Sequence, residues 1–568
     1  MESTNRPAVT DALVAAALTF VLTAVWAWRD WPALSTLQLP DADDLMRLQQ
    51  IRDWLGGQAF ADLAQHRLGA NGVPMHWSRL ADLVPGGIIW CLTGIVGQHQ
   101  AELVAVILWP AILLAAAVML SGRIARRIGR DETAVPAMIV AAIAFPASTM
   151  FIPGRIDHHG LQLVLLLVTV SRLVRPPSIG AGMGAGVAAA LSLVVGMEMA
   201  PLLAVAAAVM VADWVVEAPG ARERLLGFGI GLGSATLAAS LLFRSLAWDY
   251  PACDGFTAIS AQATWIASFL PIVLALSGRH AKPHFRAALA GAGAMALAAA
   301  FLTGAPQCLS PYGSVDPALQ RLWLTRVAEA QSLLAAPPST ALGFVGLAVA
   351  GLLTSLWLAW RTRQRCWILL LLLQLSAAAV MIVQLRGAYA GALLAAPALG
   401  ALIVAARRAG TLALAGAWAA SAGIIYPFAA QAAVTPGAPS VGADCTAPDL
   451  IAALGKLQPA VVMAPIDTGA PAIAFTNERL IAGAYHRDGA GNLAMYNFYR
   501  GTPEAARRIA GRWHVRWVVA CDGFGGVPAP FARALERGSA PRWMREVAHV
   551  PSGGRIFAAN PAPPTVSQ

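Results

Sequence analysis

Charged residues are scarce in this sequence, and the scarcity sets the class of protein. Of the 568 residues, 12% are charged and 57% are hydrophobic, with a mean hydropathy of +0.61. Soluble domains usually carry about 25% charged residues, so an ordinary soluble protein is excluded. Apolar runs close to the ~20 residues that cross a bilayer recur along the chain. The sequence therefore predicts a polytopic α-helical membrane protein, whose first partner is the lipid bilayer.

The sequence also lacks a signal-peptide cleavage site and any internal repeat. Residues 1–7 carry one arginine before a long apolar segment with no small-residue cleavage motif, so we expect a retained first helix. The net charge of +10 comes mostly from arginines in short loops. Such charges indicate membrane topology rather than nucleic-acid binding, and no nucleic-acid partner is expected.

Hydropathy predicts about thirteen transmembrane helices. We expect them near residues 11–29, 101–121, 133–151, 160–174, 181–197, 199–216, 225–243, 261–278, 286–303, 341–360, 366–385, 389–406 and 410–430. The arginine-bearing loops between these spans all fall on one side, which the positive-inside rule makes cytoplasmic. We therefore expect a bacterial inner-membrane protein with a cytoplasmic amino terminus and a periplasmic tail.

The tail differs in composition from the rest of the chain. Residues 460–464 and 515–520 are short β-rich runs, and residues 503–510 between them look helical. We expect a transmembrane domain over residues 1–430, with long outer loops at 30–100 and 304–340, and a small periplasmic α/β domain over residues 431–568. The final residues, from about Asn560, are expected to form a loose end.

Six cysteines are present, and four of them fall in predicted outer segments. Cys253 and Cys308 lie in two outer loops, and Cys445 and Cys521 lie in the tail. Each pair can form a disulfide in an oxidising compartment or remain reduced, and the sequence leaves both outcomes open.

Residues 154–160 place polar side chains between two long apolar stretches. The segment reads Gly-Arg-Ile-Asp-His-His-Gly and includes Asp157 and His159. Charged groups at a membrane edge are costly, so they indicate a functional site. The alternative is a solvated turn between two helices.

The first outer loop opens with carboxylates at positions 41, 43 and 44. One aspartate would be enough to cap a helix, so three together favour a hard cation, Mg²⁺ or Mn²⁺. Asp43 and Asp44 are therefore candidate ligands with Asp157 and His159. Residues 45–55, which follow, have the spacing of an amphipathic helix near the membrane interface.

Three isolated charged residues complete the outer-side set. Glu329 lies in a long outer loop and is a further candidate ligand or base. Arg386 stands alone at the outer end of an apolar span, where it can snorkel or bind a phosphate. Glu198, at the junction of two spans, can bind a sugar hydroxyl or an acceptor, or can make a structural hydrogen bond at a helix end.

These elements, in this order and on this side, resemble the catalytic subunit of oligosaccharyltransferase, a member of the GT-C class of membrane glycosyltransferases. Asp43 best matches the metal-binding aspartate of the family's first outer loop, with Asp41 and Asp44 as close alternatives. Asp157 matches the acid of its second loop, where His159 replaces a second acid. Glu329 matches the glutamate of its fifth loop, and Arg386 falls where an arginine contacts the donor pyrophosphate. The thirteen-span plan with an outer C-terminal domain also corresponds.

One family motif is missing. The Trp-Trp-Asp motif that reads the glycosylation sequon is replaced by residues 464–469, which keep Asp467 and a glycine but no tryptophan pair. The acceptor that the resemblance implies is therefore open to protein, glycan or lipid. About twenty residues later, His486 and Arg487 stand in a segment suited to a sugar or phosphate. We expect them to line the acceptor path, although ordinary loop surface is the alternative.

The resemblance implies a metal-dependent, inverting glycosyltransferase. A polyprenyl-(di)phosphate sugar is the expected donor, held at Arg386, and Mg²⁺ or Mn²⁺ is held by Asp43, Asp44, Asp157 and His159. Asp43, Asp157 and Glu329 are the expected catalytic residues, and Glu198, Asp467, His486 and Arg487 are expected to contact the sugar or acceptor. A transporter or flippase of the same lipid-linked glycan is the alternative, although the acids gather on one side and no repeat is found. A receptor with a periplasmic sensor domain would leave those acids unexplained.

Overall fold

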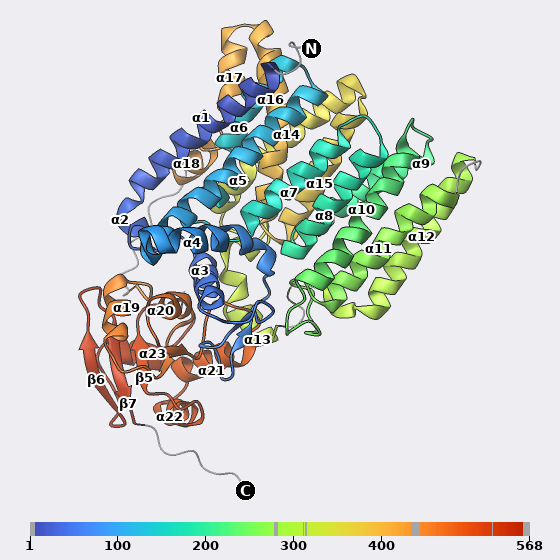
Figure 1. Ribbon diagram of the computed structural model, residues 1–568. Helices are drawn as coiled ribbons and strands as arrows, with labels where there is room; N and C mark the ends of the chain where they lie inside the picture. Colours follow the sequence, from blue (N-terminus) through green and yellow to red (C-terminus); the bar gives the residue numbers. More distant parts are fainter. Residues whose placement is uncertain are drawn as a thin grey trace. The chain divides into compact units, whose positions relative to one another are not determined.

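The computed structural model describes residues 6–277, 282–309, 312, 315–432, 444–524 and 526–560 (Figure 1). The chain forms two compact units. The first contains Met1–Gln38, Trp77–Gly313 and Ala328–Thr435, and the second contains Leu39–His76, Ser314–Val327 and Pro436–Gln568. The second unit thus combines the tail with one segment from each of the two long loops. The predicted boundary near residue 431 adjoins residues 433–443, and the predicted loose end falls mainly on residues 561–568; both segments lie outside the described residues.

The first unit is helical throughout its described part. Its α-helices are α1 (Arg6–Arg29), α2 (Trp31–Leu34), α4 (Leu83–Val96), α5 (Gln98–Ile128), α6 (Ala134–Ala142), α7 (His159–Leu173), α8 (Ile179–Val195), α9 (Ala200–Val215), α10 (Ala221–Leu242), α11 (Ala258–Ser277), α12 (Pro283–Gly304), α14 (Pro338–Thr362), α15 (Arg365–Val383), α16 (Gly387–Ala409), α17 (Thr411–Ser421) and α18 (Ile425–Ala432). Short 3₁₀ helices join them at Arg79–Ala81, Asp131–Thr133, Ala147–Phe151, Pro306–Leu309 and Ala328–Ala330.

Within the described residues, eight helices are long and apolar enough to cross a bilayer, or nine if α17 and α18 count as one bent span. The eight are α1, α5, α10, α11, α12, α14, α15 and α16. Four shorter apolar helices, α4, α7, α8 and α9, have 14 to 17 residues. The prediction of a polytopic helical membrane protein is confirmed, whereas the number thirteen stays a prediction.

Two predicted spans are broken in the structure. In 133–151, α6 ends at Ala142 and a 3₁₀ helix begins at Ala147, because Pro146 cannot continue an α-helix. In 410–430, α17 and α18 meet at an angle of 81°. Gly423 at that bend lies so close to the backbone of Ile143 and Phe145 that a Cβ atom would come within 2.6 Å of it. The sequence also missed α4, an apolar helix within the predicted loop 30–100.

Helices α8 and α10 lie side by side (Figure 1) and touch through glycines. A Cβ atom on Gly182 or Gly186 would stand 2.0 or 2.2 Å from a carbonyl oxygen of α10. Gly227 and Gly231 of α10 face the backbone of α8 just as closely. Small residues four apart allow such close approach, which gains van der Waals contact where lipid offers no hydrophobic drive.

The second unit contains a mixed sheet with helices around it. Its elements are α3 (Ala42–Leu55), β1 (Ala64–Gln65), β2 (Val73–Pro74), α13 (Pro317–Leu322), α19 (Pro448–Gly455), β3 (Val461–Met463), α20 (Gly469–Phe475), β4 (Arg479–Leu480), α21 (Gly489–Arg500), α22 (Pro503–Arg512), β5 (Trp517–Ala520), α23 (Pro530–Glu536), β6 (Met544–His549) and β7 (Arg555–Ala559), with 3₁₀ helices at Leu324–Arg326 and Ile466–Thr468. The sheet order is β4-β3-β5-β7-β6. The first three strands are parallel and the last two pair antiparallel. The two predicted strands correspond to β3 and β5, and the predicted helix corresponds to α22.

The first-loop segment is built into this unit. Residues 44–51 of α3 are buried, and α3 packs against α20, where Arg52 donates to the Ala474 carbonyl at 2.9 Å. The expectation of an amphipathic helix was therefore wrong, since the buried run 44–51 covers every face of α3. Its location near the membrane interface stays a prediction.

Two disulfides form, each within one unit. Cys253 pairs with Cys308 in the first unit, and Cys445 pairs with Cys521 in the second. Both pairs that the sequence left open are thus oxidised, and each cross-link joins segments distant in sequence.

Candidate functional site

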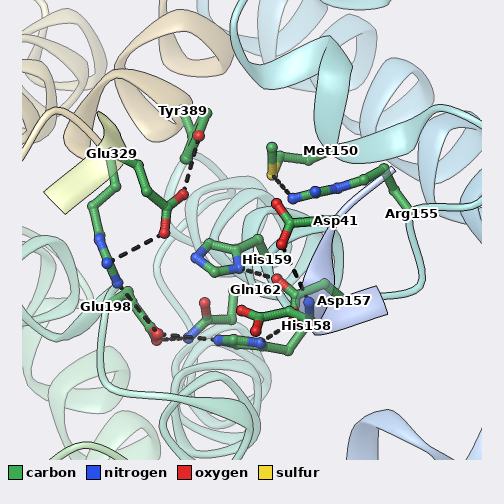
Figure 2. A network of polar contacts seen from close by, with 12 residues as sticks. Asp41, Met150, Arg155, Asp157, His158, His159, Gln162, Glu198, Glu329 and Tyr389 are labelled. Atoms are coloured by element: carbon green, nitrogen blue, oxygen red, sulfur yellow. Dashed lines mark hydrogen bonds and ion pairs between the residues drawn. The ribbon is translucent and has the colours of Figure 1, made fainter. Parts of the chain in front are cut away.

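The polar segment at 154–160 is the centre of a buried network in the first unit (Figure 2). It follows the 3₁₀ helix that breaks the predicted span, and α7 begins at His159. Asp157 accepts hydrogen bonds from both neighbouring imidazoles: His158 Nδ1 lies 2.5 Å from Oδ1, and His159 Nδ1 bonds Oδ2. All three side chains are buried. A solvated turn is therefore excluded.

Glu198 continues the network from the junction of α8 and α9. Its Oε1 lies 3.0 Å from His158 Nε2, and its Oε2 accepts a 2.7 Å hydrogen bond from Gln162 Nε2. Gln162 stands one turn into α7, so the contact joins two helical segments. Arg386 Nη1 also lies 3.9 Å from Glu198 Oε1. Glu198 thus links the histidine pair to the arginine that precedes α16.

Arg386 is held by Glu329 on its other side. Its Nη2 lies 3.3 Å from Glu329 Oε1 and donates to the Tyr312 hydroxyl at 2.8 Å. The hydroxyl of Tyr389, in the first turn of α16, donates to Glu329 Oε2 at 3.2 Å. The backbone N–H of Arg386 also donates to the Glu329 carbonyl at 3.0 Å. The residues matched to the fifth loop and to the phosphate-binding arginine are therefore neighbours.

The electrostatics of the network favour charged groups. Burial opposes the charged form of His158, but Asp157 and Glu198 outweigh it and raise the pKa of His158 to about 10. Burial would raise the pKa of Asp157, yet the two imidazoles hold it well below its usual value. For Glu198, burial is likewise outweighed, chiefly by His158, and its pKa is lowered. Positive and negative side chains therefore alternate in the site, and their mutual attraction compensates for the loss of hydration on burial.

Arg386 stays protonated, and it has two acidic neighbours, Glu198 and Glu329. Burial opposes the charge of Arg386, while Glu329, Tyr312 and Glu198 raise its pKa above the usual value. The pKa of Glu329 is lowered, because Arg386 and His159 outweigh its burial. A cation so oriented, with its Nε atom buried and unbonded, retains donor capacity for a further anion.

The histidine–aspartate cluster has the donor atoms of a metal site. Ligand atoms of Asp157, His158 and His159 all lie within 4.8 Å of one another. His159 Nε2 is buried without a hydrogen-bond partner, whereas both ring nitrogens of His158 face carboxylates. His159 also lines a small cavity of about 10 Å³ together with Glu198, Arg386 and Tyr389. Asp157 and His159 therefore fit a divalent metal, and imidazole favours Mn²⁺ over Mg²⁺ among the two expected ions.

The first-loop carboxylates lie in the second unit, at the start of α3. Asp41 is the N-cap and accepts the backbone N–H of Asp43 at 3.2 Å, and Asp43 and Asp44 follow in the first turn. Capping thus accounts for Asp41, as the simpler interpretation held. Because Asp157 and His159 belong to the first unit, their convergence with Asp43 and Asp44 stays a prediction.

The three tail residues are also in the second unit. Asp467 is exposed on the 3₁₀ helix Ile466–Thr468. The ring of His486 lies 4.8 Å from that of His76, and Arg487 Nη1 donates to the Met75 carbonyl at 3.2 Å. His486 and Arg487 are thus half-buried against the first-loop segment, and the cavity that they would share with the outer-loop acids stays a prediction.

Sequence reasoning assigned no role to several members of the network. His158 bonds both Asp157 and Glu198, Gln162 fixes Glu198, and Tyr312 and Tyr389 hold Arg386 and Glu329. His158 could have been found by its position in the motif. Gln162 could have been found by its spacing on α7, one turn after His158. Tyr312 carried no signal, because its role depends on a contact across 74 residues of chain.

Comparison with solved structures identifies the fold. No protein-family model matches the chain, and no curated protein sequence does either. The oligosaccharyltransferase of Archaeoglobus fulgidus, tethered with an acceptor peptide containing the NVT sequon, is similar with a TM-score of 0.67 and 13% identity, over 98% of this chain and 74% of that chain. The same protein in complex with zinc and sulfate is similar with a TM-score of 0.64 and 14% identity, over 97% of this chain and 73% of that chain. AglB from that organism, in complex with an inhibitory peptide and a dolichol-phosphate, has a TM-score of 0.63 and 13% identity, over 90% of this chain and 69% of that chain.

These similarities confirm the fold that the motifs implied. The chain has the GT-C membrane fold of the archaeal oligosaccharyltransferases. At 13% to 14% identity the likeness concerns the fold, and function has to be argued from the site.

Proposed function

We propose that the protein is a membrane glycosyltransferase that moves a sugar or oligosaccharide from a polyprenyl-(di)phosphate donor to an acceptor. The single observation that carries the proposal is the buried chain of contacts from Asp157 through His158, Glu198 and Arg386 to Glu329. So many charged groups are costly at the edge of a membrane unless they serve a reaction. A dolichol-phosphate bound to AglB, which has the same fold, supports a lipid-linked donor.

Arg386 is the proposed phosphate-binding residue. Its planar guanidinium can bind two phosphate oxygens at once. Glu329 and Tyr312 fix the position of this side chain before a donor arrives. A preorganised cation of this kind stabilises the charge that develops on the leaving phosphate without reorganising during the reaction.

Asp157 and His159 are proposed to hold Mn²⁺ or Mg²⁺, with Asp43 and Asp44 as further ligands. When bound, such a metal supplies Lewis-acid stabilisation of the leaving phosphate. His158 holds one oxygen of Asp157 and so orients the carboxylate. A complex of the archaeal protein with zinc and sulfate supports a metal-binding fold but does not identify the ion.

Glu329 or Asp43 is proposed to orient the acceptor nucleophile or to accept its proton. The lowered pKa of Glu329 keeps the carboxylate ionised, so it can accept a hydrogen bond from the nucleophile and orient it. Transfer would proceed with inversion at the sugar carbon. Asp467, His486 and Arg487 would contact the acceptor, and Glu198 would hold a sugar hydroxyl in addition to orienting His158 and Arg386. The missing tryptophan pair leaves the acceptor a glycan, a lipid or a protein.

We further propose thirteen spans in a bacterial inner membrane, with the amino terminus in the cytoplasm and residues 431–568 in the periplasm. The arginine-rich loops support this orientation. The two disulfides support an oxidising compartment for both cysteine pairs. A reporter that is active only in the cytosol, fused after Gln568, should be inactive; activity would reverse the orientation.

The test of the function is transfer of a radiolabelled polyprenyl-linked sugar by the purified protein in vesicles. We expect labelled product with wild type and roughly 100-fold less with Arg386→Ala. Trans-bilayer movement of the labelled lipid without any product would favour the flippase instead. A double variant, His486→Ala with Arg487→Ala, should lose transfer to the acceptor while keeping donor binding, and equal loss of both would exclude their acceptor role.

A further inference from the structure

The second unit contains a cleft of about 810 Å³ whose lining residues have no assigned role in the proposed transfer. This volume lies in the range of small-molecule binding sites, about 300–1,000 Å³. Residues 69–71 of the first-loop segment form one wall, and one face of α21 forms another. The end of α22, with Trp513 and His514, closes the third side.

The walls of the cleft are fixed by main-chain contacts. The N–H of Gly69 donates to the Leu480 carbonyl at 2.8 Å, and the N–H of Leu480 donates to the Arg67 carbonyl at 2.8 Å. This segment therefore continues the sheet beyond β4. From α21 the cleft is lined by Ala490, Leu493, Ala494 and Asn497, the spacing of a single helix face. The cleft is thus formed before any ligand binds.

The charged groups that line the cleft carry one sign. Arg479 and Arg512 are exposed and form no ion pair within the described residues, and His514 stands beside them. No aspartate or glutamate is among the lining residues. Asp488 lies directly behind Gly69, where a Cβ atom would come 3.1 Å from its Oδ1. Burial raises the pKa of Asp488 to about 8, so at pH 7 this carboxyl is largely neutral and does not cancel the arginines.

The remaining lining groups suit a sugar. Trp513 is half-buried, so its ring can pack on the apolar face of a pyranose. Asn71 and Asn497 are exposed amides that can bond hydroxyl pairs. His514 takes a left-handed backbone conformation, φ 54°, of the kind that commonly ends an α-helix, here directly after α22.

We propose that this cleft binds an acidic oligosaccharide, with carboxylates on Arg479 and Arg512 and a sugar ring on Trp513. Guanidinium groups bind carboxylates through paired hydrogen bonds. An acidic peptide is less well suited, because the edge of β4 is already covered by residues 67–69, and no strand can be added there. Where the bound glycan is the acceptor, the inference rests on the proposed function; binding itself does not require transfer.

The test is isothermal titration of the full-length protein in detergent, without donor lipid. The probes are tetragalacturonate, the neutral maltotetraose, inorganic phosphate and a hexaglutamate peptide. We expect binding of tetragalacturonate alone. The double variant Arg479→Ala with Arg512→Ala, and separately Trp513→Ala, should weaken it at least tenfold. Arg507→Ala with Arg508→Ala removes two exposed charges from the same helix outside the cleft and should leave the affinity unchanged.

Several results would overturn the proposal. They are no binding of tetragalacturonate, equal binding of maltotetraose, phosphate or hexaglutamate, or equal weakening by the Arg507 and Arg508 control. Unchanged thermal unfolding of each variant ensures that lost affinity is not lost structure. If the glycan binds and no sugar transfer is found, the transfer proposal fails and the binding site stands.

Discussion

Arg386 and Glu329 are joined twice: Nη2 of the arginine lies 3.3 Å from Oε1 of the glutamate, and the arginine N–H donates to the glutamate carbonyl at 3.0 Å. The side-chain contact sets charge against charge, and the backbone contact fixes where the 3₁₀ helix Ala328–Ala330 meets the start of α16. These two contacts fix the arginine and the glutamate relative to each other. A preorganised pair of this kind is what transition-state stabilisation requires.

The first prediction concerns that arginine. Arg386→Ala should lower sugar transfer by roughly 100-fold, the usual cost of removing one preorganised charge-stabilising donor. The transfer rate of Arg386→Lys should lie between those of wild type and Arg386→Ala, because lysine keeps the charge but loses the paired donors. The measurement is the initial rate of transfer in vesicles. Arg407→Ala, an exposed arginine at the other end of α16, is the matched control and should retain the wild-type rate. A fully active Arg386→Ala would remove the phosphate role.

The second prediction concerns the metal. EDTA should abolish transfer, and added Mn²⁺ should restore it at lower concentration than Mg²⁺, because an imidazole is among the ligands. His159→Ala should raise the Mn²⁺ concentration needed for half-restoration, by about 10-fold or more. His284→Ala removes an exposed histidine from the first turn of α12 and should change nothing. Undiminished transfer in EDTA, with metal-free protein verified by elemental analysis, would contradict the metal site.

The third prediction concerns pH and the buried Asp488. Its folded-state pKa, about 8, is above the unfolded value near 3.8, so between these values the folded protein holds one more proton than the unfolded chain. The stability that this proton provides is complete below pH 3.8 and is lost as the pH rises through 8. Asp488→Asn should therefore unfold at a higher temperature than wild type at pH 9, with the gap shrinking toward pH 4.

The measurement for Asp488 is the apparent unfolding temperature in detergent across that pH range. Asp522→Asn, an exposed aspartate in the same unit, should follow the wild-type curve. Parallel curves for wild type and Asp488→Asn would show that the carboxyl titrates normally.

The fourth prediction concerns the contact between α8 and α10. Gly186→Ala would place a Cβ atom 2.2 Å from the Phe228 carbonyl oxygen, so the helices must separate. Overpacking of this size costs about 1–3 kcal/mol, and the apparent unfolding temperature should fall. Gly180→Ala, on the same helix, meets nothing within 4 Å and should be neutral or slightly stabilising. Equal behaviour of the two variants would show that the helices are not in glycine contact.

The local features of the chain could be predicted from its sequence. The scarcity of charge and the recurrence of apolar runs determined a helical membrane protein, because both depend on composition over about 20 residues. The motifs around Asp157, Glu329 and Arg386 indicated candidate site residues, and the GT-C fold that they implied was confirmed. The β-rich runs at 460–464 and 515–520, which are bounded by turn residues, likewise predicted the strands β3 and β5.

Only the tertiary structure decided how those pieces are used. It broke the predicted span at 133–151 between Ala142 and Ala147, a break that the continuous hydropathy of this segment does not reveal. It buried residues 44–51 of α3, a helix that packs against α20 in the second unit. It also gave His158 its two carboxylate partners and Arg386 its tyrosine. Hydropathy and motif spacing are local quantities, whereas a hydrogen bond across 74 residues depends on where the whole chain returns.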